Sequence, residues 1–316
     1  MKRTLTHASL IVVAMLTVAA GMVVGQQPPA GAPPQGRPGG PGRGPGFPPL
    51  GDPQRITDNL YWLGGAGGNT AIFITANGVV LVDTKLADNG QGILDRVRKV
   101  TNKPITHIIN THTHGDHTGS NAFFPASIEI VSQENTAANM MKLDAFKDAA
   151  TRQGLPDRTY KDKLTLLGGN DAIDLYYFGP AHTNGDTFVV FRNARVMHTG
   201  DAFATKSLAI IDRGNGGSGV AYGDTFGKAS TGIQNVSTVI GGHSDTLMTW
   251  QDFVDYGEFN RLYLAHARES LRMNKTPEQA AAELRLPEKF KDYTLTGGRG
   301  GPGGNFGALF QELRGQ

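Results

Sequence analysis

The stretch His112-Thr113-His114-Gly115-Asp116-His117 places three histidines and one aspartate within six residues. It follows a short apolar segment at residues 105–109 that predicts a β-strand, and Gly115 provides a bend. Site residues are commonly held in a loop at the end of a strand. Imidazole nitrogens and carboxylate oxygens are preferred ligands of Zn²⁺ and similar divalent ions. The stretch therefore predicts a loop that binds a divalent metal.

Three further candidate ligands follow in the second half of the chain. His182 lies between two predicted strands, Asp201 directly follows a predicted strand at residues 195–198, and His243 follows another at residues 236–240. Each residue lies on a glycine-containing turn. Any one of them alone would more often be a turn or core residue than a ligand. Together with the first run, they form a set large enough for two metal ions.

Apolar runs and helical periodicities alternate along the chain. The sequence predicts a strand-helix-strand unit at residues 79–82, 88–100 and 105–109, which implies parallel pairing of its two strands. The other predicted strands cover residues 128–131, 172–178, 187–191, 195–198 and 236–240, and the other predicted helices cover residues 133–150, 249–270 and 276–284. The last helix begins with Thr276, Pro277 and Gln279, a capping box with proline at the first helical position. Two halves of comparable size predict an α/β fold with two layers of sheet faced by helices.

The two ends of the chain differ in composition from its centre. Residues 1–25 have a basic start, an apolar run and small residues before Gln26, as in a secretory signal peptide, and we expect cleavage near Gly25. An uncleaved membrane anchor is the alternative. Residues 26–50 predict a disordered Pro/Gly-rich linker, residues 51–296 the folded domain, and residues 297–316 a Gly-rich C-terminal tail, whose segment 305–316 either docks on the body or stays free.

These ends predict a periplasmic or secreted protein with no stable membrane insertion after signal cleavage. The chain has no cysteine, which excludes disulfides and a lipid-modified cysteine anchor. Its formal net charge of +2 falls to zero once Lys2 and Arg3 leave with the signal peptide. Lysines and arginines are scattered among acidic residues, so nothing favours nucleic-acid binding. We expect a small-molecule substrate, and the sequence leaves the oligomeric state open.

The His-x-His-x-Asp-His run, followed in order by His182, Asp201 and His243, resembles the metallo-β-lactamase superfamily over roughly residues 52–268. The resemblance implies a four-layer αββα sandwich with the site at one edge of the sheets. It also implies that His112, His114 and His182 hold one metal, that Asp116, His117 and His243 hold the second, and that Asp201 bridges the two. Asp83, at the end of the predicted strand 79–82, matches a position that supports the ligand loop.

Two divalent ions about 3.5 to 4 Å apart can share a water and lower its pKa towards about 7. We therefore expect a hydrolase in which a metal-bridging hydroxide is the nucleophile and Asp116 orients it. The expected cofactor is two Zn²⁺ ions, with Fe or Mn possible, and the expected substrate contains an ester, thioester, lactone or β-lactam-type amide bond. A β-lactamase proper is less expected, because one zinc β-lactamase subclass uses a cysteine ligand and another lacks a bridging aspartate. One alternative is a persulfide dioxygenase-like mononuclear iron oxidoreductase, against which the complete set with His117 and His243 argues. Another is a non-catalytic metal-binding module.

The remaining polar residues carry weaker signals. We expect structural roles for three histidines, His107, His198 and His266. Asp186 either accepts a hydrogen bond from a ligand histidine or caps a turn. Residues 64–70 and 203–206 either touch substrate or only connect elements, and we expect Lys206 to be solvated.

Overall fold

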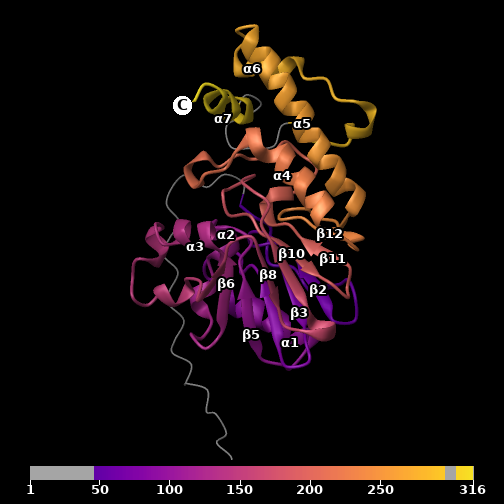
Figure 1. Ribbon diagram of the computed structural model, residues 1–316. Coiled ribbons are helices and arrows are strands. Elements are labelled where there is room, and N and C mark those ends of the chain that lie inside the picture. Colours follow the sequence, from indigo (N-terminus) through magenta and orange to yellow (C-terminus); the bar gives the residue numbers. More distant parts are fainter. Residues whose placement is uncertain (1–45, 296–303, 316) are drawn as a thin grey trace, which may run out of the picture. The chain divides into compact units, whose positions relative to one another are not determined.

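The computed structural model describes residues 46–295 and 304–315, and these form two β-sheets flanked by helices (Figure 1). The predicted signal peptide, most of the predicted linker and the start of the predicted C-terminal tail lie outside the described residues. Within the described part, no helix is both long and apolar enough to span a membrane.

The first sheet contains seven strands that are ordered as they occur along the chain. They are β1 (Gln54–Arg55), β2 (Leu60–Leu63), β3 (Thr70–Ile74), β4 (Val79–Val82), β5 (Ile105–Ile109), β6 (Glu129–Gln133) and β7 (Arg158–Tyr160). Strands β1 to β4 pair antiparallel, and β4 to β7 pair parallel. The parallel pairing of β4 and β5, on either side of helix α1 (Gly90–Val100), confirms the predicted strand-helix-strand unit.

The second sheet contains six strands in the order β13-β12-β11-β10-β9-β8. They are β8 (Lys163–Leu166), β9 (Ile173–Tyr176), β10 (Phe188–Phe191), β11 (Val196–His198), β12 (Thr238–Ile240) and β13 (Met248–Thr249). All neighbours pair antiparallel except β11 and β12, which are parallel. As a result, the β9–β10 connection and the ends of β11 and β12 lie at the same edge of the sheet.

Three hydrophobic clusters separate four layers. Val80 and Val82 of β4 meet Val189 and Phe191 of β10 in the cluster between the sheets. The other residues of β4 face outward and pack against α1, and the other residues of β10 pack against helices on the opposite side. Strands buried on both faces need apolar residues at every position, which explains the continuous apolar runs in the sequence.

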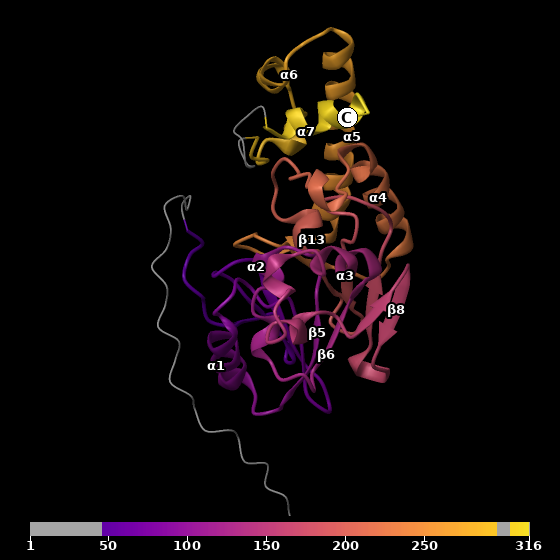
Figure 2. The ribbon, with the colours of Figure 1, turned by 90° about the vertical axis from the view of Figure 1, so that its left-hand side faces the viewer.

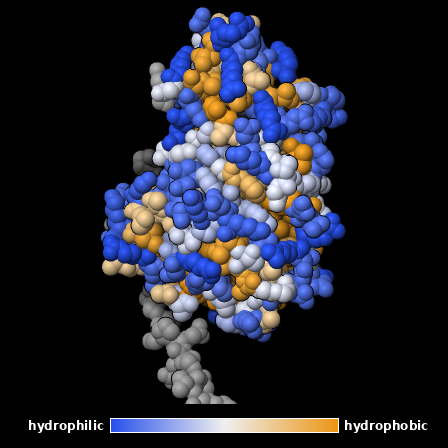
Figure 3. All heavy atoms as spheres, viewed as in Figure 1, coloured by the Kyte–Doolittle hydropathy of each residue, from blue (hydrophilic) through white to orange (hydrophobic). Residues whose placement is uncertain are grey.

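The outer layers are helical (Figure 2). Helix α1 covers the first sheet, and helices α4 (Gly219–Gly232) and α5 (Trp250–Arg272) cover the second. The architecture is the expected αββα sandwich. Hydrophilic and hydrophobic residues are interspersed on the surface, and hydrophobic ones are visible among the helices at the top of Figure 3.

Two helices differ from the sequence prediction. The helix predicted at residues 133–150 is α3 (Glu134–Met140), and short 3₁₀ turns at Asp144–Phe146 and Arg152–Gly154 follow it. Helix α4 is not predicted by the sequence, because its four glycines lower helix propensity. Gly223 and Gly227, one turn apart, both lie against the Arg261 side chain of α5, where a methyl group would overlap it. The glycines therefore allow α4 and α5 to approach closely.

The described part of the C-terminal segment docks on the body. Helix α6 (Pro277–Glu283) has the predicted capping box, and helix α7 (Gly304–Leu313) packs beside it with its apolar face in the cluster that contains α4 and α5. Residues 46–50, expected to belong to the linker, also contact the body: Leu50 packs in the α1 cluster, and the carbonyl of Pro48 accepts a hydrogen bond from Ala66.

Helix α7 also caps the N-terminus of α4. The carboxylate of Glu312 accepts hydrogen bonds from the Ser218 hydroxyl and from the backbone amide of Gly219 at 2.9 Å. An anion at this position stabilises the free amides and the positive end of the helix. The contact couples the C-terminal segment to the second sheet's helical layer.

We predict that Glu312→Gln lowers the free energy of unfolding by about 1–2 kcal/mol, because it removes a charged acceptor from a helix N-terminus. Urea unfolding of the full chain measures this change. Glu269→Gln removes the carboxylate of an exposed pair with Arg272 and is the matched control, expected to leave stability nearly unchanged because exposed ion pairs contribute little. Equal effects of the two substitutions would contradict the capping role.

Candidate metal centre

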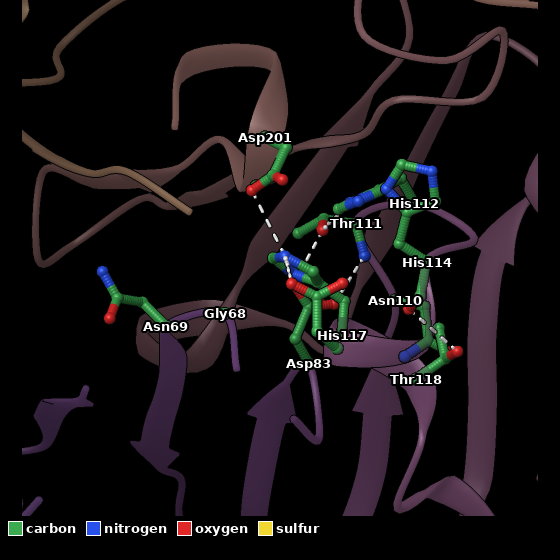
Figure 4. Close-up of polar contacts among 12 residues, drawn as sticks. Gly68, Asn69, Asp83, Asn110, Thr111, His112, His114, His117, Thr118 and Asp201 are labelled. Carbon is green, nitrogen blue, oxygen red and sulfur yellow. Dashed lines mark hydrogen bonds and ion pairs between the residues drawn. The ribbon is translucent and has the colours of Figure 1, made fainter. Parts of the chain in front are cut away.

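The first candidate ligands follow β5 directly. His112 and His114 lie in the extended segment after this strand, and Asp116 and His117 lie in the single turn of helix α2 (Gly115–Thr118). Both His112 and His117 are fully buried. Figure 4 shows their side chains at the ends of the strands of the first sheet, facing Asp201 from the second.

The other three candidates come from the second sheet. His182 lies in the β9–β10 connection, Asp201 in the 3₁₀ turn Gly200–Phe203 after β11, and His243 in the turn after β12. Because the strand directions bring these three connections to one edge, residues far apart in the sequence meet the ligand loop of the first sheet. The structure thus brings together all seven residues predicted from the sequence.

The seven side chains form two groups. Ligand atoms of His112, His114, His182 and Asp201 lie within 4.8 Å of one another, as do those of Asp116, His117 and His243. Asp201 also reaches the second group: its Oδ1 lies 3.2 Å from His117 Nε2, and its Oδ2 lies 3.2 Å from His243 Nε2. This position, between both groups, is the one expected of a bridging carboxylate.

Hydrogen bonds on the outer side of the site orient four of the histidine rings. His117 donates from Nδ1 to Asp83 at 2.7 Å, His182 donates from Nδ1 to the carbonyl of Ile210 at 2.8 Å, and His114 donates from Nε2 to Asp212 at 2.6 Å. His112 Nδ1 donates to the hydroxyl of Thr111 at 3.0 Å, since that hydroxyl donates its own hydrogen to Asp83. In the neutral form of each ring, as a metal ligand requires, the opposite nitrogen carries a lone pair that faces inward.

These inward nitrogens fit a metal cation. His114 Nδ1 and His182 Nε2 are 3.0 Å apart, and His117 Nε2 and His243 Nε2 are 3.4 Å apart. Nε2 of His112 is buried without a hydrogen-bond partner among the described residues. Buried polar atoms without a partner are costly, and the lone pairs of His114 Nδ1 and His182 Nε2 repel each other when both rings are neutral. In the second group, burial opposes protonation of His117 and His243, but the charge of Asp201 raises the pKa of both, so without a metal these two rings carry protons that an ion would displace. A divalent ion in each group would bind these inward nitrogens and give His112 Nε2 a partner. The nitrogen and oxygen donors suit Zn²⁺, Fe or Mn.

The charges of the site also favour cations. Burial opposes ionisation of Asp116, but its hydrogen bond with His243 and the charge of His117 lower its pKa to about 2. Burial opposes ionisation of Asp201 as well, yet the neighbouring charges of His117 and His243 hold its pKa well below the usual value. Asp116 and Asp201 are therefore ionised at neutral pH, the form in which a carboxylate binds a metal ion.

Comparisons with known proteins agree with this geometry. A model of the metallo-beta-lactamase superfamily matches residues 63–255. The chain belongs to this superfamily. It is 32% identical over 144 residues to the uncharacterized protein YobT of Bacillus subtilis, covering 40% of this chain and 58% of that protein. It is 30% identical over 155 residues to the 2,4-dinitroanisole O-demethylase subunit alpha of Nocardioides sp., covering 48% of this chain and 43% of that subunit. The chain thus spans about half the length of these two relatives.

Other proteins similar to this chain have lower sequence identity. The metallo-beta-lactamase type 2 of Bacillus cereus is 26% identical over 201 residues, covering 60% of this chain and 72% of that protein. A sec-alkylsulfatase from Pseudomonas sp. has a TM-score of 0.68 at 14% identity and covers 83% of this chain and 50% of its own. A metallo-beta-lactamase from Pontibacter korlensis has a TM-score of 0.57 at 16% identity and covers 67% of this chain and 99% of its own. These two structures show the shared fold.

Glycines let two loops approach the candidate ligands closely. A side chain at Gly68 would overlap the ring of His117, and one at Gly242 would overlap the carboxylate of Asp201. Lys85, fully buried, holds the first of these loops by donating to the carbonyls of Leu63 and Gly68, both at 2.7 Å. Burial lowers the pKa of Lys85 to about 7. The loop at residues 64–70 is thus part of the site's wall as well as a connection.

The remaining predicted residues lie outside the two ligand groups. His198 donates from Nε2 to the carbonyl of Asn69, and burial lowers its pKa to about 4. His107 pairs with Glu129, and His266 bonds the carbonyl of Ala280. Asp186 accepts hydrogen bonds from the amide and hydroxyl of Thr183, so of its two expected roles it has that of a turn cap. Lys206 is not simply solvated, because it forms an ion pair with Asp252 at 2.6 Å.

Asp212 is a site residue that the sequence does not indicate. It accepts the Nε2 hydrogen of His114, and this bond lowers the pKa of Asp212. The residue lies in an irregular loop, 98 positions from His114. Because ligand histidines usually need an acceptor for their outer nitrogen, such a residue is expected, but its position in the sequence cannot be predicted.

We predict that Asp212→Asn weakens metal binding about 10- to 100-fold, because His114 loses the anionic acceptor that fixes its ring. Competition with a chromogenic chelator measures the affinity, and circular dichroism checks that the variant is folded. Asp224→Asn, an exposed aspartate of α4 beside Arg261, is the matched control. Unchanged affinity in Asp212→Asn would contradict the role given to this carboxylate.

Proposed function

We propose that the protein is an exported, dinuclear metal-dependent hydrolase that cleaves an ester, thioester, lactone or amide bond in a small molecule. The observation that carries the proposal is the position of Asp201, which belongs to the first ligand group and lies 3.2 Å from two histidine nitrogens of the second. Such a set suits two ions better than one. Zn²⁺ is the proposed metal, and the same donors accept Fe or Mn.

Two bound ions would supply a water of lowered pKa, near 7, and an electrophile for the substrate carbonyl oxygen. The residues of the chain hold and align this chemistry. Asp116 is ionised, with its Oδ2 3.3 Å from His243 Nε2, so it can accept a hydrogen bond from the attacking water and orient it. Asp83, Asp212 and the Ile210 carbonyl keep three ligand rings fixed, so that little reorganisation is needed during reaction.

The relatives widen the range of substrates that deserves testing. One relative is named for demethylation of 2,4-dinitroanisole, one structural neighbour is a sec-alkylsulfatase, and others are β-lactamases. A β-lactam is a secondary candidate, because this chain has no cysteine and has an aspartate between the two groups. Esters, thioesters and lactones are the primary candidates.

A mononuclear iron oxidoreductase of the persulfide dioxygenase kind is the alternative reaction. The second group, Asp116, His117 and His243, weighs against it, because these three side chains converge as tightly as the first group. Oxygen consumption with a persulfide distinguishes the two reactions.

We predict about two metal ions per chain by elemental analysis, and loss of hydrolysis of esters, thioesters or lactones when the metal is removed. Asp116→Ala should lower kcat/KM at least 10²-fold while the protein stays folded, because both a ligand and the group that orients water are lost. Asp186→Asn, at the turn beside His182 but outside the ligand groups, is the control. Full activity after metal removal would refute the proposal, and metal binding without turnover across a panel that includes β-lactams and sulfate esters would indicate a non-catalytic module.

Export is a separate part of the proposal and rests on the composition of residues 1–25. We predict that the mature protein begins near Gln26, which N-terminal sequencing after cell fractionation can measure. A membrane-bound chain that keeps residues 1–25 would favour an uncleaved anchor.

A further inference from the structure

A cavity of about 200 Å³ lies directly beside the ligand groups. Asp201 and His243 form one end of it, and the rest of the wall comes from the segment after Asp201 and from helix α5. Ile210 is 39% exposed and marks where this wall meets solvent. A molecule bound at the metal centre would therefore extend into this cavity.

The wall away from the metal centre is mostly apolar. It includes Ala204, Leu208, Ile210 and Tyr256, with two hydroxyl side chains beside them. Tyr256 is stacked on Phe203, with ring centroids 4.4 Å apart, and is held rigidly in the core. An apolar cavity of about 150 Å³ is large enough to bind benzene, so this cavity can hold one aromatic ring.

The described wall of the cavity offers no cation to a charged substituent. None of the described residues that line it is a lysine or an arginine. Lys206, next in sequence to the lining residues Thr205 and Ser207, is paired with Asp252 at 2.6 Å. A carboxylate on the buried part of a substrate would lose its hydration there without gaining a cationic partner, which is costly.

A second aromatic residue contacts His243, the ligand that also lines the cavity. The ring of Phe47 stacks on the imidazole of His243, with centroids 5.6 Å apart and an angle of 21° between the planes. Phe47 is 46% exposed, and the neighbouring residue Pro48 is fixed by its hydrogen bond with Ala66 at 2.7 Å. His243 thus contacts an aromatic side chain, Phe47, in addition to lining the cavity.

We propose that this cavity binds an uncharged aromatic group of the substrate, of about one ring, and that it makes aryl or benzyl esters better substrates than small alkyl or anionic ones. The inference rests on the proposed hydrolase function, since it places the ring beside the bond that would be cleaved. It concerns binding in the first place, and binding can be measured without turnover.

The direct test titrates the metal-loaded full chain with benzyl alcohol and with 4-(hydroxymethyl)benzoate, observed by ligand NMR. Benzyl alcohol is expected to bind at least fivefold more tightly than its anionic analogue. Ala204→Leu, which fills the cavity, should weaken benzyl alcohol binding about tenfold or more, because the ring loses its apolar contacts. Elemental analysis should show unchanged metal content in this variant.

Ala76→Leu is the matched control. Ala76 lines a different cavity, together with Thr106 and His107 near the start of β5, whereas the ligand loop follows the end of that strand. The control variant should bind both probes as the unmodified protein does. Tighter binding of the anionic probe, or binding of benzyl alcohol that survives Ala204→Leu, would overturn the inference, because each result places the ligand elsewhere or on the metal itself.

A second variant tests the same cavity in the opposite direction. Ile210→Ala enlarges the cavity and should raise the ratio of kcat/KM for 1-naphthyl acetate to that for phenyl acetate, whereas Ala204→Leu should lower the ratio for phenyl acetate to methyl acetate. Ester hydrolysis with neither ratio changed would overturn the inference while leaving the proposed function intact. Ring binding that Ala204→Leu abolishes, in a protein that hydrolyses no substrate, would support the cavity and refute the proposed function.

Discussion

The carboxylate of Asp83 is the contact on which the geometry of the site depends. Asp83 directly follows β4, has a φ of 63° in the left-handed region, and is fully buried. It accepts hydrogen bonds from the amide and hydroxyl of Thr111 and from Nδ1 of His117. One side chain therefore fixes the start of the ligand loop, one ligand ring directly and, through the Thr111 hydroxyl, the ring of His112 as well. A strained backbone conformation costs about 1–3 kcal/mol, and these three bonds offset that cost.

The same principle extends over the rest of the centre. Each of the four rings has its outer nitrogen bound to one acceptor. The acceptors come from three segments: Asp83 after β4, Thr111 after β5, and the loop that contains Ile210 and Asp212. The outer hydrogen bonds thus fix which nitrogen of each ring faces inward, and these nitrogens converge. A metal that enters such a site meets ligands already in place, so binding requires little ordering of side chains. Repulsion between the facing lone pairs of His114 and His182 in the metal-free state further favours binding.

The sequence alone predicts the layers and the ligands, because each depends on a residue pattern that is local in the chain. Strands buried on both faces must be continuously apolar, so β4 and β10 stand out in the sequence. A cluster such as His112 to His117 has few uses other than metal binding. Helix α4 could not be predicted, because its glycines have low helix propensity. Two of them make room for the side chain of Arg261 on α5, a contact that the sequence does not reveal. The outer acceptor Asp212 and the cavity wall at Leu208 and Ile210 lie in an irregular loop with no periodicity to reveal them.

That irregular loop also connects the metal centre to the C-terminal helix. Its residue Asp212 binds His114 by its side chain and the carbonyl of His182 by its amide, at 2.9 Å. A few residues on, Ser218 donates from its amide to Ala181 and from its hydroxyl to Glu312 of α7. The loop is thus held between two ligand histidines on one side and α7 on the other. Because the loop has little regular structure of its own, the position of Asp212, and with it the ring of His114, depends on contacts at both ends. The docked C-terminal segment therefore supports the ligand geometry although its described residues contribute none of the side chains in the two ligand groups.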